Sequence, residues 1–381
     1  MNQGGSFSPY AALYHDAVTS ARRTGASDIH FEPTLAGVDI RFRVMGEMQA
    51  PWKRLGEEHR RPFLNEVKRQ ANLSIAISGR PQDGRASVQE LKLDLRVNLL
   101  PTLHGEKVVL RLLDLTREFR LDALGLYQVA HEALAGVSRL RNGVVLISGP
   151  TGSGKTTTLY SLLCSMDRRS KNIVTLEDPV EYGIEGLNQV PIDRKVSFSS
   201  ALRGVLRQDP DVILVGEIRD PETAALAFQA AATGHLVLST IHANGAAEVV
   251  DRLVNLGVDR LTIATNLRLS VAQRLVKTLC LKCSRPVPSD FFKEVSRGLF
   301  SSSDERCLVG AFRIRIGEGC SECHEGFIGR LPVVEFMTQG DITAYLADST
   351  TPRVLDVSLK RSCLHHASLG QIDIREVMDV A

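Results

Sequence analysis

Residues 144–159 read VVLISGPTGSGKTTTL, and this stretch decides the fold of the segment around it. Its four leading apolar residues, Val144 to Ile147, are typical of a strand buried on both faces. The glycine-rich turn that follows has P-loop spacing and leads into a helix. There, backbone N–H groups can turn toward phosphate, Lys155 can bridge the β and γ oxygens, and the Thr156 hydroxyl can hold Mg²⁺. The stretch predicts a nucleotide-binding loop, with a glycine-rich turn that binds nothing as the alternative.

The residues expected to hold the nucleotide are Gly149, Pro150, Thr151, Gly152, Ser153, Gly154, Lys155, Thr156 and Thr157. Three further apolar runs, at 173–176, 212–215 and 236–238, alternate with helical stretches. This alternation is typical of a parallel sheet covered on both faces. We therefore expect an α/β fold with a RecA-like P-loop core.

Two acidic residues follow predicted strands of this core. Glu217 is expected at a carboxyl end beside the phosphates, where it can orient or deprotonate the attacking water. Many P-loop enzymes have an aspartate just before such a glutamate, but this chain has Gly216. Magnesium must then rely on Thr156, water and another acid. Glu177, at another strand end, is the candidate, and a turn or helix cap is the alternative for Glu177 and Asp178.

Two histidines flank the apolar run 236–238. His242 is expected at the carboxyl end of the strand, where it can sense the γ-phosphate as a hydrogen-bond donor. His235 is expected at the opposite end and is the weaker candidate. An ordinary core or surface histidine is the alternative for both.

Four of the seven cysteines form two Cys-x-x-Cys pairs, Cys280, Cys283, Cys320 and Cys323. Each pair can give two thiolates to one tetrahedral ion, and four protein ligands leave no open position for catalysis. A structural zinc site is expected, with a redox pair or an iron–sulfur centre as alternatives. Cys164, Cys307 and Cys363 have no assigned role.

The region before Leu121 is rich in arginine, which supplies fourteen of its eighteen cationic residues. Guanidinium groups bind phosphate and carboxylate bidentately, so this bias favours anion recognition, with a solvated basic face as the alternative. A helical pattern at 10–24 and period-two alternation at 38–44 and 86–97 predict a small α/β domain. A charged stretch near 115–123 separates it from the core.

These boundaries predict four segments along the chain. They are a small N-terminal domain at 1–118, the P-loop core at 124–275, a tetracysteine insert at 276–335 and a C-terminal helical region at 336–381.

Composition narrows the possible partners and location. Forty-six Lys+Arg against forty-four Asp+Glu leave a net charge of +2, so no general attraction to nucleic acid is expected. The N-terminus lacks the cationic start and apolar run of a signal peptide. Polar residues interrupt the uncharged stretch 223–247, which argues against a membrane span. A cytosolic protein is expected.

These motifs, in this order, resemble the secretion ATPase superfamily, specifically the motors of type II secretion and type IV pilus assembly. The resemblance runs from Ser27 to beyond Glu335. It rests on SDIHFEP at 27–33, PQDGR at 81–85, DLRV at 94–97, GEKVVLRLL at 105–113, the P-loop, EDPVE at 177–181, GEIRD at 216–220, TGH at 233–235 with His242, and the four paired cysteines. The glycine before Glu217 is expected in this family. The Glu177 and His242 segments look like its aspartate and histidine boxes.

The resemblance implies a homo-hexamer using ATP, Mg²⁺ and Zn²⁺, in which a PAS-like N-terminal domain closes over the nucleotide of another subunit. Arg85, Arg96 and Arg111 match the arginines that reach the phosphates, and at least one is expected to act as a finger. Such a motor lies in the cytoplasm, peripheral to the inner membrane, and drives a platform protein that assembles pilus or pseudopilus subunits. The cysteines point away from retraction motors. Only twenty-six residues precede Ser27, as in a minimal or trimmed member.

Two other functions are compatible with a P-loop. A DNA-translocating or DNA-uptake ATPase needs a basic, aromatic-lined channel, whereas this chain has one Trp and six Tyr. Salt-dependent DNA binding would favour that function. A nucleotide-gated scaffold with little turnover is the second, and an ATPase assay separates it from a motor.

Overall fold

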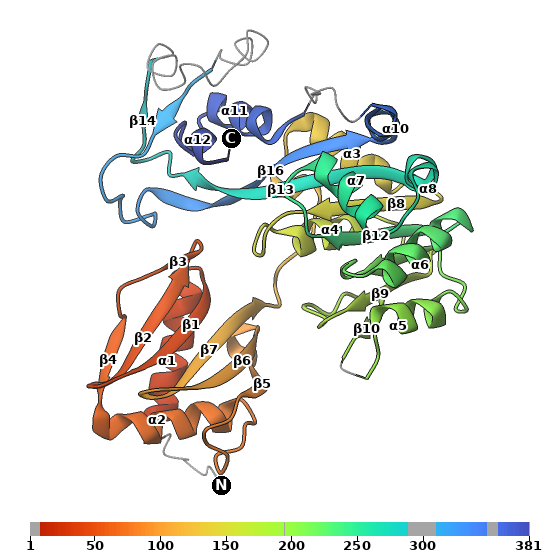
Figure 1. Ribbon diagram of the computed structural model, residues 1–381. Helices are drawn as coiled ribbons and strands as arrows, with labels where there is room; N and C mark the ends of the chain where they lie inside the picture. Colours follow the sequence, from red (N-terminus) through yellow and green to blue (C-terminus); the bar gives the residue numbers. More distant parts are fainter. Residues whose placement is uncertain (1–7, 194, 289–309, 349–356, 381) are drawn as a thin grey trace. The chain divides into compact units, whose positions relative to one another are not determined.

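Figure 1 shows the computed structural model, which describes residues 8–193, 195–288, 310–348 and 357–380. The chain forms two compact units, Met1–Glu118 and Phe119–Ala381, called here the N-terminal and C-terminal units. Each unit has a hydrophobic core of its own.

The N-terminal unit is an antiparallel sheet with two helices. Its elements are α1 (Pro9–Arg23), β1 (Ala26–Thr34), β2 (Gly37–Val44), β3 (Glu47–Met48), β4 (Lys53–Gly56), α2 (Glu57–Gln70), β5 (Gln82–Val88), β6 (Leu93–Thr102) and β7 (Gly105–Asp114). The strand order is β3-β2-β1-β7-β6-β5, with β4 paired to β2. The helix and the strand predicted at 38–44 are confirmed, whereas the stretch 86–97 divides into the end of β5 and the start of β6 around a short 3-10 helix at Gln89–Leu91.

The two faces of this sheet differ in character. Ile29 and Phe31 of β1 lie in the buried core together with Phe63 of α2. Successive strand residues point to opposite faces, so Asp28 and His30 belong to the other face. That second face carries charged side chains, and its composition matters for the site described below.

The C-terminal unit is built on a seven-stranded sheet. Its strands are β8 (Gly143–Ser148), β9 (Ile173–Glu177), β10 (Asn188–Pro191), β11 (Val212–Val215), β12 (Leu236–Ile241), β13 (Leu267–Leu279) and β16 (Phe327–Thr338). Their order is β10-β9-β11-β12-β8-β13-β16, and only the pair β13–β16 is antiparallel.

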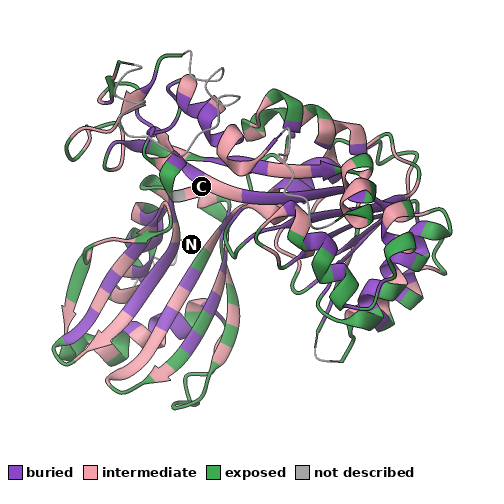
Figure 2. Cartoon of the chain, turned by 45° about the horizontal axis from the view of Figure 1, so that its top comes forward, coloured by how far each residue is buried: buried purple, intermediate pink, exposed green. Residues whose placement is uncertain are grey.

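Helices cover both faces of this sheet. They are α3 (Gln128–Val137), α4 (Lys155–Cys164), α5 (Phe198–Val205), α6 (Pro221–Ala232), α7 (Ala246–Asn255), α8 (Arg260–Asn266) and α10 (Gln339–Ala347). Val144 and Leu146 pack in one core with α6 and α7, whereas Val145 and Ile147 pack in another with α3 and α4. Figure 2 shows the central strands buried along their length. The predicted parallel-sheet α/β fold is confirmed.

The first cysteine pair, Cys280 and Cys283, follows the end of β13, and the second pair, Cys320 and Cys323, precedes the start of β16. Between these strands, β14 (Arg285–Pro286) and β15 (Arg313–Ile314) form a small two-stranded sheet. The range predicted for the insert, 276–335, therefore begins and ends on strands of the main sheet. The last helices, α11 (Leu359–Ser368) and α12 (Glu376–Val380), pack against the same two strands around Val276 and Val333.

Candidate active site

Four parallel strands bring the predicted chemical residues to one edge of the sheet. Ser148, the last residue of β8, is level with Ile241 at the end of β12. Val215 of β11 is level with Leu176 of β9. The P-loop, Glu177, Glu217 and His242 all lie at or follow these carboxyl ends. Ligands of open parallel sheets bind at this edge, so the fold supports one site from four separate segments.

The P-loop backbone requires glycine at several positions. Gly149, Gly152 and Gly154 have φ values of 143°, 80° and 85°. A Cβ on Gly149 would lie 2.4 Å from the carbonyl oxygen of Gln273. Side chains are strained or excluded here, and the loop can present its N–H groups at the start of α4.

Lys155 is the first residue of α4, and its amino group turns back over the loop. Its Nζ donates to the carbonyl oxygens of Gly149 at 2.8 Å and Pro150 at 2.9 Å. The pKa of Lys155 is lowered overall, chiefly by burial. The charge of Glu217 partly offsets this shift, and the charge of Arg274 adds to it. A bound phosphate would compete with these two carbonyl oxygens for the Lys155 ammonium group, which already lies over the loop.

Gln273 on β13 holds the P-loop from below, and sequence reasoning missed it. Its Nε2 donates to the carbonyl oxygen of Ser153 at 2.7 Å, and its Oε1 accepts from the hydroxyl of Thr158 at 2.9 Å. The side chain is buried. A glutamine within the strand stretch LSVAQRLV at 269–276 was the available signal, because buried amides need partners.

Glu217 follows β11 and is fixed through its neighbours. The hydroxyl of Thr240 donates to the carbonyl oxygen of Gly216 at 2.7 Å, and the N–H of Ile218 donates to the carbonyl oxygen of Thr240 at 2.9 Å. The Glu217 carboxylate forms an ion pair with Arg219 and lies 3.6 Å from Nε2 of His242. The structure thus brings Glu217 and His242 together beside the P-loop strand.

Glu177 ends β9 inside a network of side chains. Its carboxylate accepts from the hydroxyls of Tyr160 and Thr175 and from Nε2 of Gln189. Burial, together with the hydrogen bond to Glu177, raises the pKa of Tyr160 above its ordinary value. The carboxylate caps no helix or turn through these bonds, and its magnesium or catalytic role stays a prediction.

His235 lies at the opposite end of β12 from His242. Its Nδ1 is 2.9 Å from the carbonyl oxygen of Ala230 and 3.3 Å from the hydroxyl of Thr233. These local contacts agree with an ordinary structural histidine.

The three candidate arginines form one row across the sheet of the N-terminal unit. Arg85 is directly opposite Arg96, and Arg96 is directly opposite Arg111. Direct partners in neighbouring strands point to the same face, and like charges in such positions destabilise a sheet. Arg111 is also opposite Asp28 and forms an ion pair with it at 3.1 Å. The three arginines therefore share one face of this sheet, and a role for them in binding phosphate stays a prediction.

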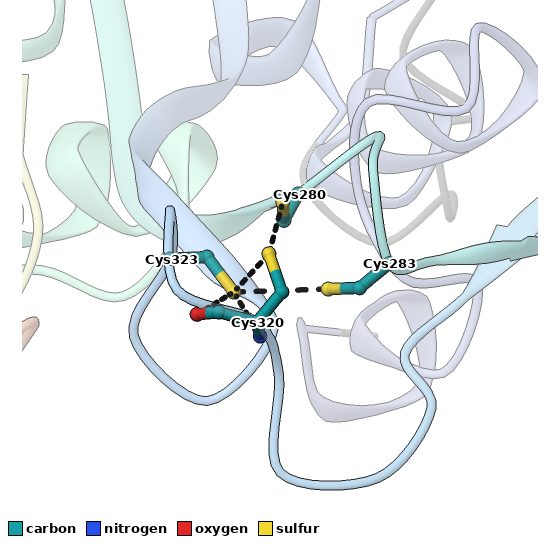
Figure 3. A group of neighbouring side chains, drawn as sticks. All are labelled: Cys280, Cys283, Cys320 and Cys323. Carbon is teal, nitrogen blue, oxygen red and sulfur yellow. Dashed lines mark hydrogen bonds between the residues drawn. The ribbon is translucent and has the colours of Figure 1, made fainter.

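The four paired cysteines form a cluster (Figure 3) in which all four Sγ atoms lie within 4.8 Å of one another. Sγ separations are 3.8 Å for Cys280–Cys320, 3.7 Å for Cys283–Cys323 and 3.6 Å for Cys320–Cys323. A tetrahedron with metal–sulfur bonds of about 2.3 Å has edges of about 3.8 Å. A disulfide bond is only about 2.05 Å long. The donor set therefore fits one tetrahedral ion.

Two of the other three cysteines, Cys164 and Cys363, belong to described helices and lie apart from this cluster. Cys164 ends α4 and is half-buried, and Cys363 is buried in α11. Burial raises the pKa of both thiols, to about 12 for Cys363. Cys307 lies outside the described residues.

Comparison with known proteins places the chain in a family. A family model described as "Type II/IV secretion system protein" matches residues 4–378. The chain belongs to this family. It is 39% identical over 395 residues to the type II secretion system ATPase E of Vibrio cholerae, covering 98% of this chain and 75% of that protein. It is 42% identical over 339 residues to the type IV pilus assembly ATPase PilB of Acinetobacter baylyi, covering 86% of this chain and 57% of that one.

Solved structures agree on the fold. The ATPase DotB of Legionella pneumophila covers 100% of this chain with a TM-score of 0.70 at 21% identity, and 98% of DotB is covered. The pilus retraction motor PilT with bound ADP gives a TM-score of 0.61 at 23% identity, with 96% of each chain covered. The predicted superfamily is confirmed, and membership of this secretion family indicates an ATPase.

Within the described ranges, the helices are too short or too polar to cross a membrane.

Proposed function

We propose that this family member is a motor ATPase that hydrolyses ATP to drive assembly of pilus or pseudopilus subunits. The observation that carries the proposal is the convergence of the P-loop, Glu217 and His242 at one sheet edge. The relatives named for type II secretion and for type IV pilus assembly support both machines equally. As a motor, the chain would act as a homo-hexamer in the cytoplasm, against a platform protein of the inner membrane.

The residues divide into binding and chemical roles. The P-loop N–H groups and Lys155 hold the phosphates, and the Thr156 hydroxyl holds Mg²⁺. Glu217 orients or deprotonates the attacking water, and His242, 3.6 Å from its carboxylate, senses the γ-phosphate. Glu177 supports magnesium from its strand end through its bonded network.

The arginine row gives the N-terminal unit its part in the reaction. A cation that arrives during closure stabilises charge developing on the γ-phosphate, and such arginines contribute about 10³–10⁵ in rate in other P-loop enzymes. At least one of Arg85, Arg96 and Arg111 would act on nucleotide of the same or a neighbouring subunit. We also propose that the chain works in this cycle as four parts. They are the N-terminal domain at 1–118, the P-loop core at 124–275, the tetracysteine insert at 276–335 and the C-terminal helical region at 336–381.

The central test compares Lys155→Ala with Glu217→Gln in phosphate-release and nucleotide-binding assays. Lys155→Ala should lose binding or turnover, because the phosphate clamp is removed. Glu217→Gln should keep ATP bound while kcat falls by about 10²–10⁴, because only proton transfer is lost. Turnover at the parental rate in Glu217→Gln would overturn the assignment.

The cysteine cluster would hold one structural Zn²⁺, supplying a rigid tetrahedral link with no open position. Metal analysis of the purified full chain should find about one zinc per chain. The double variant Cys280→Ser with Cys320→Ser should lose it, whereas Cys164→Ser, outside the cluster, should keep it. Unchanged zinc in the double variant would refute the site.

A further inference from the structure

Arg274 on β13 lies at the P-loop, although no motif pointed to it. The parallel pairing of β13 with β8 places Ala272 level with Ser148, so Gln273 and Arg274 lie level with the first residues of the loop. A Cβ built on Gly149 would lie 3.4 Å from Nη1 of Arg274. The charge of Arg274 also contributes to the lowered pKa of Lys155, after burial, and this agrees with the short distance between Arg274 and the loop.

The same guanidinium reaches the loop after β12. Its Nη2 donates to the carbonyl oxygen of Asn244 at 2.8 Å, and its Nη1 donates to the carbonyl oxygen of Gln273 at 3.1 Å. Asn244 lies two residues after His242, whose ring faces Glu217. Arg274 therefore lies between the beginning of the P-loop and the loop that carries the proposed γ-phosphate sensor.

Arg274 has no carboxylate partner in the part of the chain that the structure describes; its recorded bonds go to backbone carbonyls. The nearby Glu335 accepts instead from the N–H of Ala246, at the start of α7. A half-buried guanidinium with spare donors beside Lys155 is a site for an anion. The anion that fits this place is the terminal phosphate of the nucleotide.

We propose that Arg274 is a second phosphate-binding cation supplied from the same subunit, which contacts the γ-phosphate and fixes the His242 loop through Asn244. This inference rests on the nucleotide site proposed above. It adds a cation within the C-terminal unit, independent of the arginine row. Because the contact is to the γ-phosphate, it discriminates ATP from ADP and strengthens as charge develops during hydrolysis.

The test measures affinity for a non-hydrolysable ATP analogue and for ADP, beside turnover, in the full chain. Arg274→Ala should lower the affinity for the ATP analogue about tenfold or more, while the affinity for ADP changes less than about threefold. Its kcat should fall by about 10²-fold. Arg274→Lys should be intermediate, since one ammonium replaces a fork that serves both Asn244 and phosphate.

Arg268→Ala is the matched control, because Arg268 is on the same strand but bonds to Asn142, just before β8, and to Gln339, the first residue of α10. It should lower the melting temperature without changing the ratio of the two affinities. Unchanged affinities and turnover in Arg274→Ala would overturn the proposal. The proposal would also be overturned if Arg274→Ala lost affinity equally for the ATP analogue and for ADP while its melting temperature fell as much as that of Arg268→Ala. A parental protein that binds neither nucleotide would instead refute the nucleotide site itself.

Discussion

Replacing Arg111 by alanine separates the ion pair that the structure shows for this side chain from the phosphate contact that we propose for it. The Nε of Arg111 lies 3.1 Å from Oδ1 of Asp28, whose side chain is 8% exposed, while that of Arg111 is 58% exposed. At an effective dielectric constant of about 20, the gross attraction at this distance is about 5 kcal/mol. Solvent screening and side-chain ordering remove most of it at an exposed arginine. The buried carboxylate nevertheless loses a partner, so we expect a net loss of about 1–2 kcal/mol.

The single tryptophan allows this loss to be measured in the full chain. Trp52 lies in the N-terminal unit, stacked on Phe42 at 5.5 Å between ring centroids, and the sequence has no other tryptophan. Denaturant unfolding followed by tryptophan fluorescence therefore reports this unit alone. Arg111→Ala should shift the midpoint down, whereas the exposed Arg85→Ala should change the unfolding free energy by less than about 0.5 kcal/mol.

The double variant Asp28→Asn with Arg111→Ala then distinguishes structure from chemistry. Removing the buried charge should restore most of the stability, since no unpaired carboxylate remains. ATP turnover should stay low if Arg111 contacts phosphate, and the single variant Asp28→Asn should keep it. Recovery of both stability and turnover in the double variant would refute a phosphate role for Arg111. An unchanged Trp52 midpoint in Arg111→Ala would refute the energetic reasoning.

Two further outcomes follow from buried groups of the C-terminal unit. Tyr160→Phe removes one hydrogen-bond donor from Glu177 and should lower the free energy of unfolding, followed by circular dichroism, by about 1.5–3 kcal/mol. The control Tyr345→Phe loses a hydrogen bond to Asp251 near the surface and should lower it by less than about 1 kcal/mol. Equal losses in the two variants would contradict a stabilising role for the buried Glu177 network. Burial lowers the pKa of His366 below its ordinary value of 6.5, although the hydrogen bond with Gln371 partly raises it. The His366 ring therefore binds a proton more readily in the unfolded chain than in the native one. Stability should therefore be lost as pH falls below about 6.5. Melting temperatures measured across this pH range should fall less steeply in His366→Gln than in the parental chain. An equally steep fall in the variant would refute a contribution from His366.

The core sheet and its strand-end residues could be predicted because their signals are local. A run such as Val144 to Ile147 identifies a strand buried on both faces, and the residue after it must lie at the sheet edge. The contacts of Gln273, Arg274 and Tyr160 could not be predicted in this way. Each depends on which strands become neighbours, and no spacing along the chain specifies that β13 lies beside β8.

The two sheets also explain why the chemistry is distributed as it is. In the C-terminal unit both faces of the central strands are packed, so charged groups are excluded from the faces and gather at strand ends, where Glu217 and His242 lie. In the N-terminal unit one face of the sheet forms the apolar core, so the other can carry a row of cations from three strands. A packed sheet fixes atoms within a narrow range, which suits water activation, whereas an open charged face suits a ligand that arrives and leaves. The same alternation of side chains thus yields a rigid strand edge that carries Glu217 and His242 in one unit, and a charged sheet face that carries the three arginines in the other.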